Sequence, residues 1–196
     1  MSVKILYIHG FNSSPLSMKA ELTKEYFALH YPNVEIICPQ IKSSPFKAID
    51  QLESIVQTLH DNTWCLIGSS LGGYFASYLA EKYRVKAVLV NPAVKPYLLM
   101  SDYIGWQLNP YTNETYQVQA EHIDELKSLE QQKISENLYQ VMVQTGDEVL
   151  DYRLAAEKFR NSQLIVQQGG DHGFINFADM LPNIADYLAI NKSNTQ

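Results

Sequence analysis

The residues WCLIGSSLGG, from Trp64 to Gly73, carry the strongest structural signal in the chain. They open with a short apolar run, which predicts a buried strand, and the residues that follow have helical spacing up to Tyr83. Between strand and helix, Gly68 to Gly72 match the pattern G-x-S-x-G in the strand–turn–helix context that a nucleophile elbow requires. Because such a turn is strained and crowded, small residues must flank the central serine. Ser70 is therefore the predicted nucleophile.

Two other interpretations of this stretch fit less well. Gly68 and Gly73 have the spacing of a phosphate-binding loop, but Tyr74 and Phe75 stand where lysine and serine or threonine should follow. A dinucleotide fingerprint would need G-x-G-x-x-G, which is absent here. Ser69 is the alternative nucleophile, although it lacks the symmetrical glycines.

Apolar runs alternate with segments of helical spacing along most of the chain. The runs that predict strands are Val3–Ile8, Val34–Cys38, Trp64–Ile67, Ala87–Val90, Tyr139–Gln144 and Gln163–Val166. The predicted helices are Ser17–His30, Ile49–His60, Gly72–Tyr83, Tyr152–Arg160 and Phe177–Ile190. This alternation predicts an α/β fold with a doubly wound, mostly parallel sheet flanked by helices.

One segment interrupts the alternation. No strand is evident between Pro92 and Glu136, and such a long connection in a compact domain is usually functional or has helices of its own. We expect residues 93–136 to form a small helical lid on one α/β domain that spans residues 1–196.

Composition excludes several classes of protein. The formal net charge of −6 and the lack of a basic cluster argue against nucleic-acid binding, and 46% hydrophobic residues allow a sizeable core. The first apolar run is too short for a signal peptide, and no window reaches the length of a membrane span. Cys38 and Cys65 lie in apolar runs, which favours buried free thiols over a disulfide. We therefore expect a cytoplasmic protein.

A serine nucleophile needs a base and an acid, which follow it in the order acid, then histidine. His172 lies in a glycine-containing loop after the last predicted strand, downstream of every candidate acid. Asp147 comes first after the penultimate strand and is the predicted acid. Asp151 starts a helix and is better suited to an N-cap, while Asp171 adjoins His172 and its side chain diverges.

The loop after the first strand is expected to supply part of the oxyanion hole. Its His-Gly pair matches the hydrolase pattern, which makes the N–H groups of Phe11 and Leu71 the predicted oxyanion hole. His9 is expected to brace this loop, because no second histidine or cysteine lies at a metal-binding spacing from it. We expect no cofactor and no metal.

With these residues assembled, the chain resembles the YqiA-type bacterial esterases, a family of small α/β-hydrolase-fold proteins. The resemblance spans about Val3 to Ile190. It rests on IHGFNSSP at 8–15, GSSLGGYFA at 68–76, LVNPAVKP at 89–96, TGDEVLDY at 145–152 and GGDHGF at 169–174. It implies a minimal α/β-hydrolase fold of about six or seven strands, with Ser70, Asp147 and His172 as a catalytic triad. It also implies hydrolysis of small-molecule acyl esters, with acyl-CoA thioesters as an alternative.

The substrate itself is left open by the sequence. Asn12, Tyr97 and Trp106 are candidate substrate-binding residues, and the lid aromatics favour an apolar acyl site or simply pack the lid on the body. A non-catalytic binding protein on the same fold is the alternative from another class. The oligomeric state is open between a monomer and a weak dimer.

Overall fold

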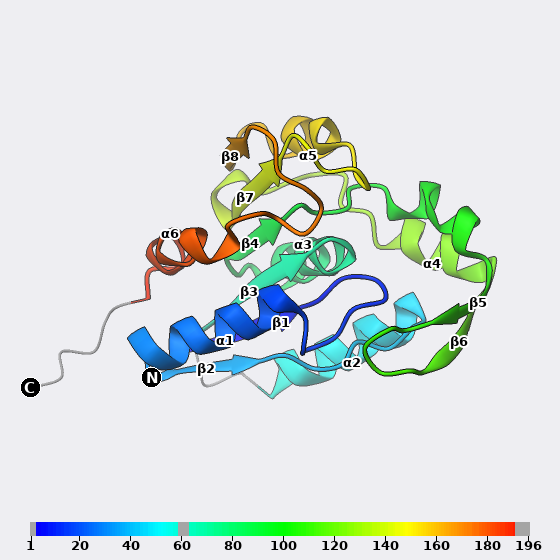
Figure 1. The fold of residues 1–196 in the computed structure, drawn as a ribbon, viewed down its shortest axis with the longest axis horizontal. Coiled ribbons are helices and arrows are strands. Elements are labelled where there is room, and N and C mark those ends of the chain that lie inside the picture. Colours follow the sequence, from blue (N-terminus) through cyan, green and yellow to red (C-terminus); the bar gives the residue numbers. More distant parts are fainter. Residues whose placement is uncertain (1–2, 59–62, 191–196) are drawn as a thin grey trace, which may run out of the picture.

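A parallel six-stranded sheet forms the centre of the molecule (Figure 1). The computed structural model describes residues 3–58 and 63–190. The strands lie in the order β2-β1-β3-β4-β7-β8, and every neighbouring pair is parallel. Their bounds are β1 Val3–Ile8, β2 Val34–Ile37, β3 Thr63–Ser69, β4 Ala87–Val90, β7 Tyr139–Gln144 and β8 Gln163–Gln167. All of the predicted strands are thus confirmed, with ends that move by at most two residues.

Helices cover both faces of the sheet and make three layers (Figure 1). On one face lie α1 Met18–His30 and α6 Leu181–Tyr187, the latter preceded by the 3-10 turn η4 Phe177–Met180. On the other face lie α2 Pro45–Gln57, α3 Leu71–Tyr83 and α5 Tyr152–Lys158, and α4 Glu121–Ser128 packs against α2 at one end of the molecule. The predicted α/β fold with a parallel sheet between helices is confirmed.

Helix α2 begins earlier than the hydrophobic spacing predicted. It starts at Pro45, four residues before Ile49, because proline is well suited to the first position of a helix, where its missing N–H costs nothing. The predicted end of this helix at His60 lies outside the described residues.

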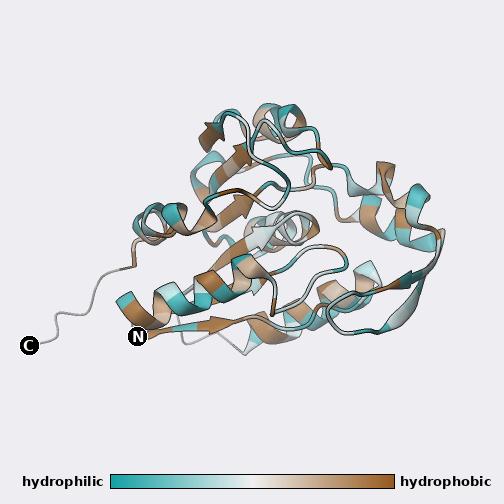
Figure 2. Ribbon diagram, viewed as in Figure 1, coloured by the Kyte–Doolittle hydropathy of each residue, from teal (hydrophilic) through white to brown (hydrophobic). Residues whose placement is uncertain are grey.

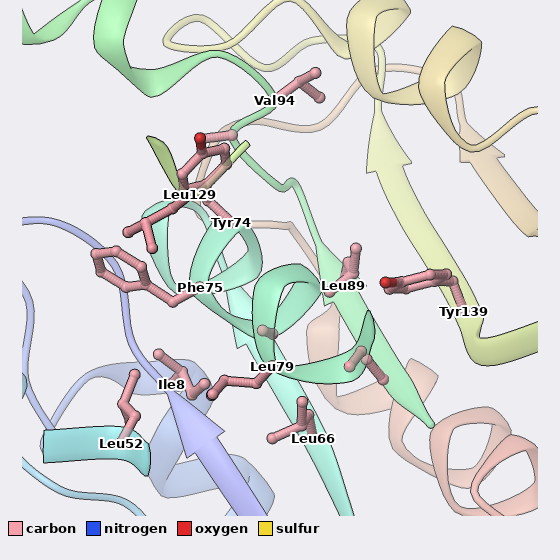
Figure 3. Packing of buried hydrophobic residues seen from close by; sticks show 14 of the residues in the cluster. Ile8, Leu52, Leu66, Tyr74, Phe75, Leu79, Leu89, Val94, Leu129 and Tyr139 are labelled. Carbon is pink, nitrogen blue, oxygen red and sulfur yellow. The ribbon is translucent and has the colours of Figure 1, made fainter. Parts of the chain in front are cut away.

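The core forms because side chains of a strand point alternately to the two faces of the sheet. Leu6 and Ile8 pack with α2 and α3, whereas Ile5 and Tyr7 pack with α1 and α6. In Figure 3, Leu66 of β3 lies beneath α3, and Figure 2 shows hydrophobic residues concentrated on the central strands. Burying each such leucine or isoleucine contributes roughly 1.5–3 kcal/mol.

The insert between β4 and β7 differs from the prediction. It contains the short helical turns η1 Pro96–Leu98, η2 Met100–Tyr103 and η3 Glu136–Leu138, together with α4, as a lid of short helices would. It also contains an antiparallel hairpin, β5 Gly105–Leu108 and β6 Thr115–Val118, which lies beside α4 at one end of the molecule (Figure 1). The expectation that this segment holds no strand was wrong.

The hairpin is hard to detect because each strand has only four residues. Asn109 closes the connecting turn, since its Oδ1 accepts hydrogen bonds from the N–H groups of Tyr111 and Thr112. A window of four residues holds too few alternations to distinguish a strand from a loop.

Both cysteines are free thiols, as predicted, but only Cys65 is fully buried, whereas Cys38 is partly exposed. Burial raises the pKa of Cys38 to about 11 and that of Cys65 to about 12, so both are protonated at neutral pH. Within the described ranges, none of the helices combines the length and the apolar character needed to cross a membrane.

Candidate active site

Ser70 lies on a sharp turn between β3 and α3. Its backbone has φ 55° and ψ −124°, a strained conformation that lifts the side chain away from the strand. The Ser70 N–H donates to the carbonyl of Val90, and the Ser70 carbonyl accepts from the N–H groups of Gly73 and Ala93. The turn is therefore held from both the neighbouring strand and its own helix.

Two glycines make this turn possible through close packing. A Cβ atom at Gly68 would lie 2.5 Å from the carbonyl oxygen of Gly72, and one at Gly72 would lie 2.0 Å from that of Ile8. Both distances are shorter than any tolerable contact, so neither position can hold a side chain without movement of the backbone. The crowding expected from the G-x-S-x-G pattern is present.

Ser70, His172 and Asp147 form one continuous chain of hydrogen bonds. Ser70 Oγ lies 3.0 Å from His172 Nε2, and His172 Nδ1 lies 2.9 and 3.0 Å from the two carboxylate oxygens of Asp147. The three residues come from three different loops at the carboxyl end of the sheet, after β3, β7 and β8. A carboxylate at Nδ1 leaves Nε2 as the acceptor, which is the tautomer that can take a proton from the serine.

The Asp147 carboxylate is held ionised by its hydrogen bonds. Burial alone would raise its pKa, and its side chain is only 2% exposed. The bonds from His172 Nδ1 and from the N–H groups of Leu150 and Val149 overcome this effect and hold the pKa below its usual value. Asp151, the alternative acid, instead caps α5 by accepting from the Arg153 N–H.

Three side chains that hold the His172 loop were missed by the sequence reasoning. Asn91 Nδ2 donates to the carbonyl of His172, and Glu148 Oε2 accepts from the His172 N–H. Gln144 Oε1 accepts from the N–H groups of Asp171 and Ile175, which lie on either side of the histidine in the loop. Asn91 and Gln144 are themselves buried. Asn91 directly follows β4 and Gln144 ends β7, and this position is the sequence signal that could have found them, whereas Glu148 lies four residues beyond β7.

The loop after β1 passes directly beside the serine. A Cβ atom at Gly10 would lie 3.0 Å from Ser70 Cβ and 3.4 Å from Ser70 Oγ, so a side chain at this position would press directly on the serine. Phe11 follows at this point and packs edge-to-face on Tyr103 at 5.1 Å. His9 is buried and accepts a hydrogen bond from the Ile41 N–H, which joins this loop to the segment after β2.

Two cavities of different character flank Ser70 and His172, and both residues line each of them. The first, here called the polar cavity, measures about 310 Å³. The polar cavity is further lined by the polar residues Tyr7, Asn12, Ser13, Ser17, Lys19 and Tyr111, and by Met18 and Phe11, of which Phe11 is shared with the second cavity. The second, here called the apolar cavity, measures about 180 Å³. The apolar cavity is further lined by Phe11, Leu71, Leu99, Met100, Tyr103 and Leu150.

Comparison with known proteins identifies the family of the chain. The model of the uncharacterised protein family UPF0227 matches residues 4–189, which is nearly the whole length. The chain belongs to family UPF0227. This confirms the resemblance to the YqiA-type proteins that the five sequence blocks indicated.

Solved structures show which fold this UPF0227 member shares. Est1E from Butyrivibrio proteoclasticus has a TM-score of 0.70 at 12% identity, with 96% of this chain and 88% of that chain covered. Alpha/beta hydrolase domain-containing protein 10 from mouse has a TM-score of 0.69 at 16% identity, with 95% and 89% covered. A Paleococcus ferrophilus monoacylglycerol lipase has a TM-score of 0.67 at 14% identity, with 94% and 93% covered. The fold of the UPF0227 chain is therefore that of the α/β hydrolases.

The predicted substrate-binding residues separate into two groups. Asn12 lines the polar cavity and accepts a hydrogen bond of 2.6 Å from the Tyr116 hydroxyl. Tyr97 lines neither cavity and donates to Glu130, while Trp106 lies on the outer face of β5 with 74% of its surface exposed. The hairpin, unseen in the sequence, turns Trp106 away from the site.

No group of three or more histidine, cysteine, aspartate or glutamate side chains in residues 3–58 and 63–190 is arranged to hold a metal ion.

Proposed function

We propose that this UPF0227 protein is a serine esterase that hydrolyses carboxylic esters through an acyl-enzyme intermediate. The observation that carries the proposal is the hydrogen-bonded chain from Ser70 Oγ through His172 to Asp147, at 3.0 and 2.9 Å. Such a chain supplies the base that a serine hydroxyl needs and the carboxylate that orients this base.

Acylation begins with attack of Ser70 Oγ on the ester carbonyl. His172 Nε2 accepts the serine proton as the new C–O bond forms, and the ionised Asp147 stabilises the imidazolium that results. Collapse of the tetrahedral intermediate breaks the bond to the alcohol, which takes the proton from His172. The acyl group is then held on Ser70 as an ester.

The negative charge on the attacked oxygen is stabilised by backbone N–H groups. Leu71 is the first residue of α3, so its N–H lies at the positive end of the helix, and Phe11 follows the glycine that touches Ser70. We assign these two N–H groups to the oxyanion hole. One such donor contributes about 3 kcal/mol to stabilisation of the transition state.

Deacylation repeats the same steps with water. His172 takes a proton from the water, hydroxide adds to the acyl carbonyl, and Ser70 leaves with the proton returned by His172. Net consumption is one ester and one water, and the products are one acid and one alcohol. A monoacylglycerol lipase shares the fold, and the activity that its name gives supports an ester substrate for this site.

The test compares two neighbouring serines. We expect Ser70→Ala to lower kcat on a short-chain p-nitrophenyl ester by roughly 10⁶-fold, by analogy with other serine hydrolases. The matched control is Ser69→Ala, because Ser69 is buried, adjacent and outside the hydrogen-bonded chain. A fluorophosphonate probe should label the wild type and Ser69→Ala but not Ser70→Ala. Wild-type protein that neither turns over esters nor reacts with the probe would instead indicate a binding protein.

A further inference from the structure

The two cavities beside Ser70 differ in chemistry, and this difference bears on the substrate. Ser70 and His172 line both cavities, so each cavity is placed to hold one half of an ester that is bound at Ser70. Among the described residues that line the two cavities, Lys19 is the single lysine or arginine, and it belongs to the polar cavity.

We propose that Lys19 is a substrate-binding residue that selects esters with an anionic group on one side of the scissile bond and an apolar group on the other. This inference rests on the esterase function proposed above. The anionic half occupies the polar cavity, and the apolar half occupies the cavity lined by Phe11, Leu99 and Met100.

Lys19 is placed to meet such a group. It lies in the first turn of α1, is half-buried, and its Nζ donates one hydrogen bond of 2.9 Å to the carbonyl of Gly173. An ammonium group has three N–H donors, so further donors can bind a ligand. Burial lowers the pKa of Lys19, although the negative charges of Asp171 and Asp147 oppose this effect. The charged form of Lys19 is therefore less stable here than in water, and a bound anion would stabilise it.

The other polar groups of this cavity favour a ligand that accepts hydrogen bonds. Ser13, Ser17 and Tyr111 contribute hydroxyl-bearing side chains to its lining, and no aspartate or glutamate is among the described residues that line it. The oxygen of the Asn12 side chain already accepts from Tyr116. A carboxylate or phosphate oxygen suits a set of donors of this kind, whereas a cation would find no carboxylate there.

The apolar cavity favours an uncharged, apolar group. Phe11, Met100 and Tyr103 line it, and no charged lysine, arginine, aspartate or glutamate is among its described lining residues. An ionised group would lose its hydration there without a compensating partner, so an aliphatic or aromatic group is favoured. The pair of cavities therefore discriminates the two ends of a substrate by charge.

A purely structural role for Lys19 must be separated from this one. Its bond to the Gly173 carbonyl lies next to His172, so loss of Lys19 can also loosen the histidine loop. Loosening would slow every ester to a similar degree, because the base is common to all substrates. Loss of a binding contact would slow only the charged ones.

The experiment measures kcat/KM on matched ester pairs with two arms. In the first arm the charge is on the acyl side: a succinate monoester of an apolar alcohol, which has a free carboxylate, is compared with the same ester whose carboxylate is blocked as a methyl ester. In the second arm the charge is on the alcohol side: the butyrate ester of glycolate, which has a free carboxylate, is compared with the butyrate ester of methyl glycolate. Wild type, Lys19→Arg and Lys19→Met are compared at low and high salt.

We expect wild type to prefer the charged member about tenfold or more in one arm, and that arm identifies which half enters the polar cavity. The preference should persist in Lys19→Arg, vanish in Lys19→Met and weaken with salt. Wild type that prefers the neutral member in both arms would overturn the inference. So would an equal loss on charged and neutral esters in Lys19→Met.

Failure of this inference is distinguishable from failure of the proposed function. Wild type that hydrolyses the neutral esters and reacts with a fluorophosphonate, yet shows no preference for charge, retains the esterase function and refutes only the role of Lys19. Wild type that hydrolyses no ester in either arm and does not react with the fluorophosphonate refutes both.

Discussion

Asn91 holds His172 in place from the neighbouring strand end. Its Nδ2 donates to the carbonyl of His172 at 3.3 Å and to that of Asp171 at 3.0 Å, while its Oδ1 accepts from the Gln144 N–H at 3.0 Å. One buried amide thus ties the loop after β8 to the end of β7. The position of the proposed base is set by a residue 81 positions away in the sequence.

Replacing Asn91 should therefore affect both turnover and stability. We expect Asn91→Ala to lower kcat about 10²-fold with little change in KM, because a small displacement of His172 is costly. It should also lower the free energy of unfolding by about 1–3 kcal/mol, since the Gln144 N–H is left without its partner. Steady-state kinetics and urea unfolding measure both. Ser77→Ala, which removes a buried hydroxyl that donates to the Tyr74 carbonyl, is the control and should leave kcat unchanged.

Two aspartates four residues apart provide a matched test of the acid. Asp147→Asn should lower kcat by roughly 10⁴-fold, because an amide at this position favours the wrong tautomer of His172. Asp151→Asn removes a charge from the N-cap of α5 and should leave kcat within about twofold. Similar kcat values for the two variants would contradict the assignment of Asp147 as the acid.

The depressed pKa of Asp147 predicts a pH-dependent contribution to stability. Because the folded-state pKa lies below the usual 3.8, the ionised carboxylate stabilises the folded protein at pH values above that. The contribution should be lost as the pH falls below about 4 and through the folded-state pKa. Urea midpoints of wild type and Asp147→Asn, compared from pH 6 to pH 3, should converge on acidification. A constant difference across this range would argue against the prediction.

The close approach of α3 to β1 predicts that Gly72 tolerates no side chain. Gly72→Ala places a methyl group about 2 Å from the Ile8 carbonyl oxygen, so backbone atoms must shift and the free energy of unfolding should fall by at least about 1–3 kcal/mol. Thermal and urea unfolding measure the loss. Ser54→Ala, on the exposed face of α2, is the control and should stay within about 0.5 kcal/mol of wild type.

Two aromatic residues of the insert should differ in their effect on substrate binding. Tyr103→Ala should raise KM for apolar esters several-fold, because Tyr103 lines the apolar cavity and packs on Phe11. Trp106→Ala should leave KM unchanged, since the indole is exposed on the outer face of the hairpin. Kinetics on esters of increasing acyl length compare the two. A larger effect of Trp106 would mean that the hairpin closes over the site.

The sheet and the elbow could be predicted because their signals are local. Strands buried on both faces appear as continuous apolar runs, and the crowding of Gly68 against Gly72 arises within five consecutive residues. The chain order of Ser70, Asp147 and His172 could be predicted as well, since parallel strands bring the loops at their carboxyl ends to one edge. The four-residue strands of the hairpin could not, because so short a segment has no distinct period.

What only the tertiary structure decided is which side chains share a space. Asn91, Gln144 and Lys19 each acquire their role by meeting a loop that lies far away in the chain. Trp106 looked suited to an apolar site until the hairpin turned it outward. The pattern of residues along the chain determines how each element forms, whereas the linings of the two cavities depend on how separate elements pack, and packing is a property of the whole fold.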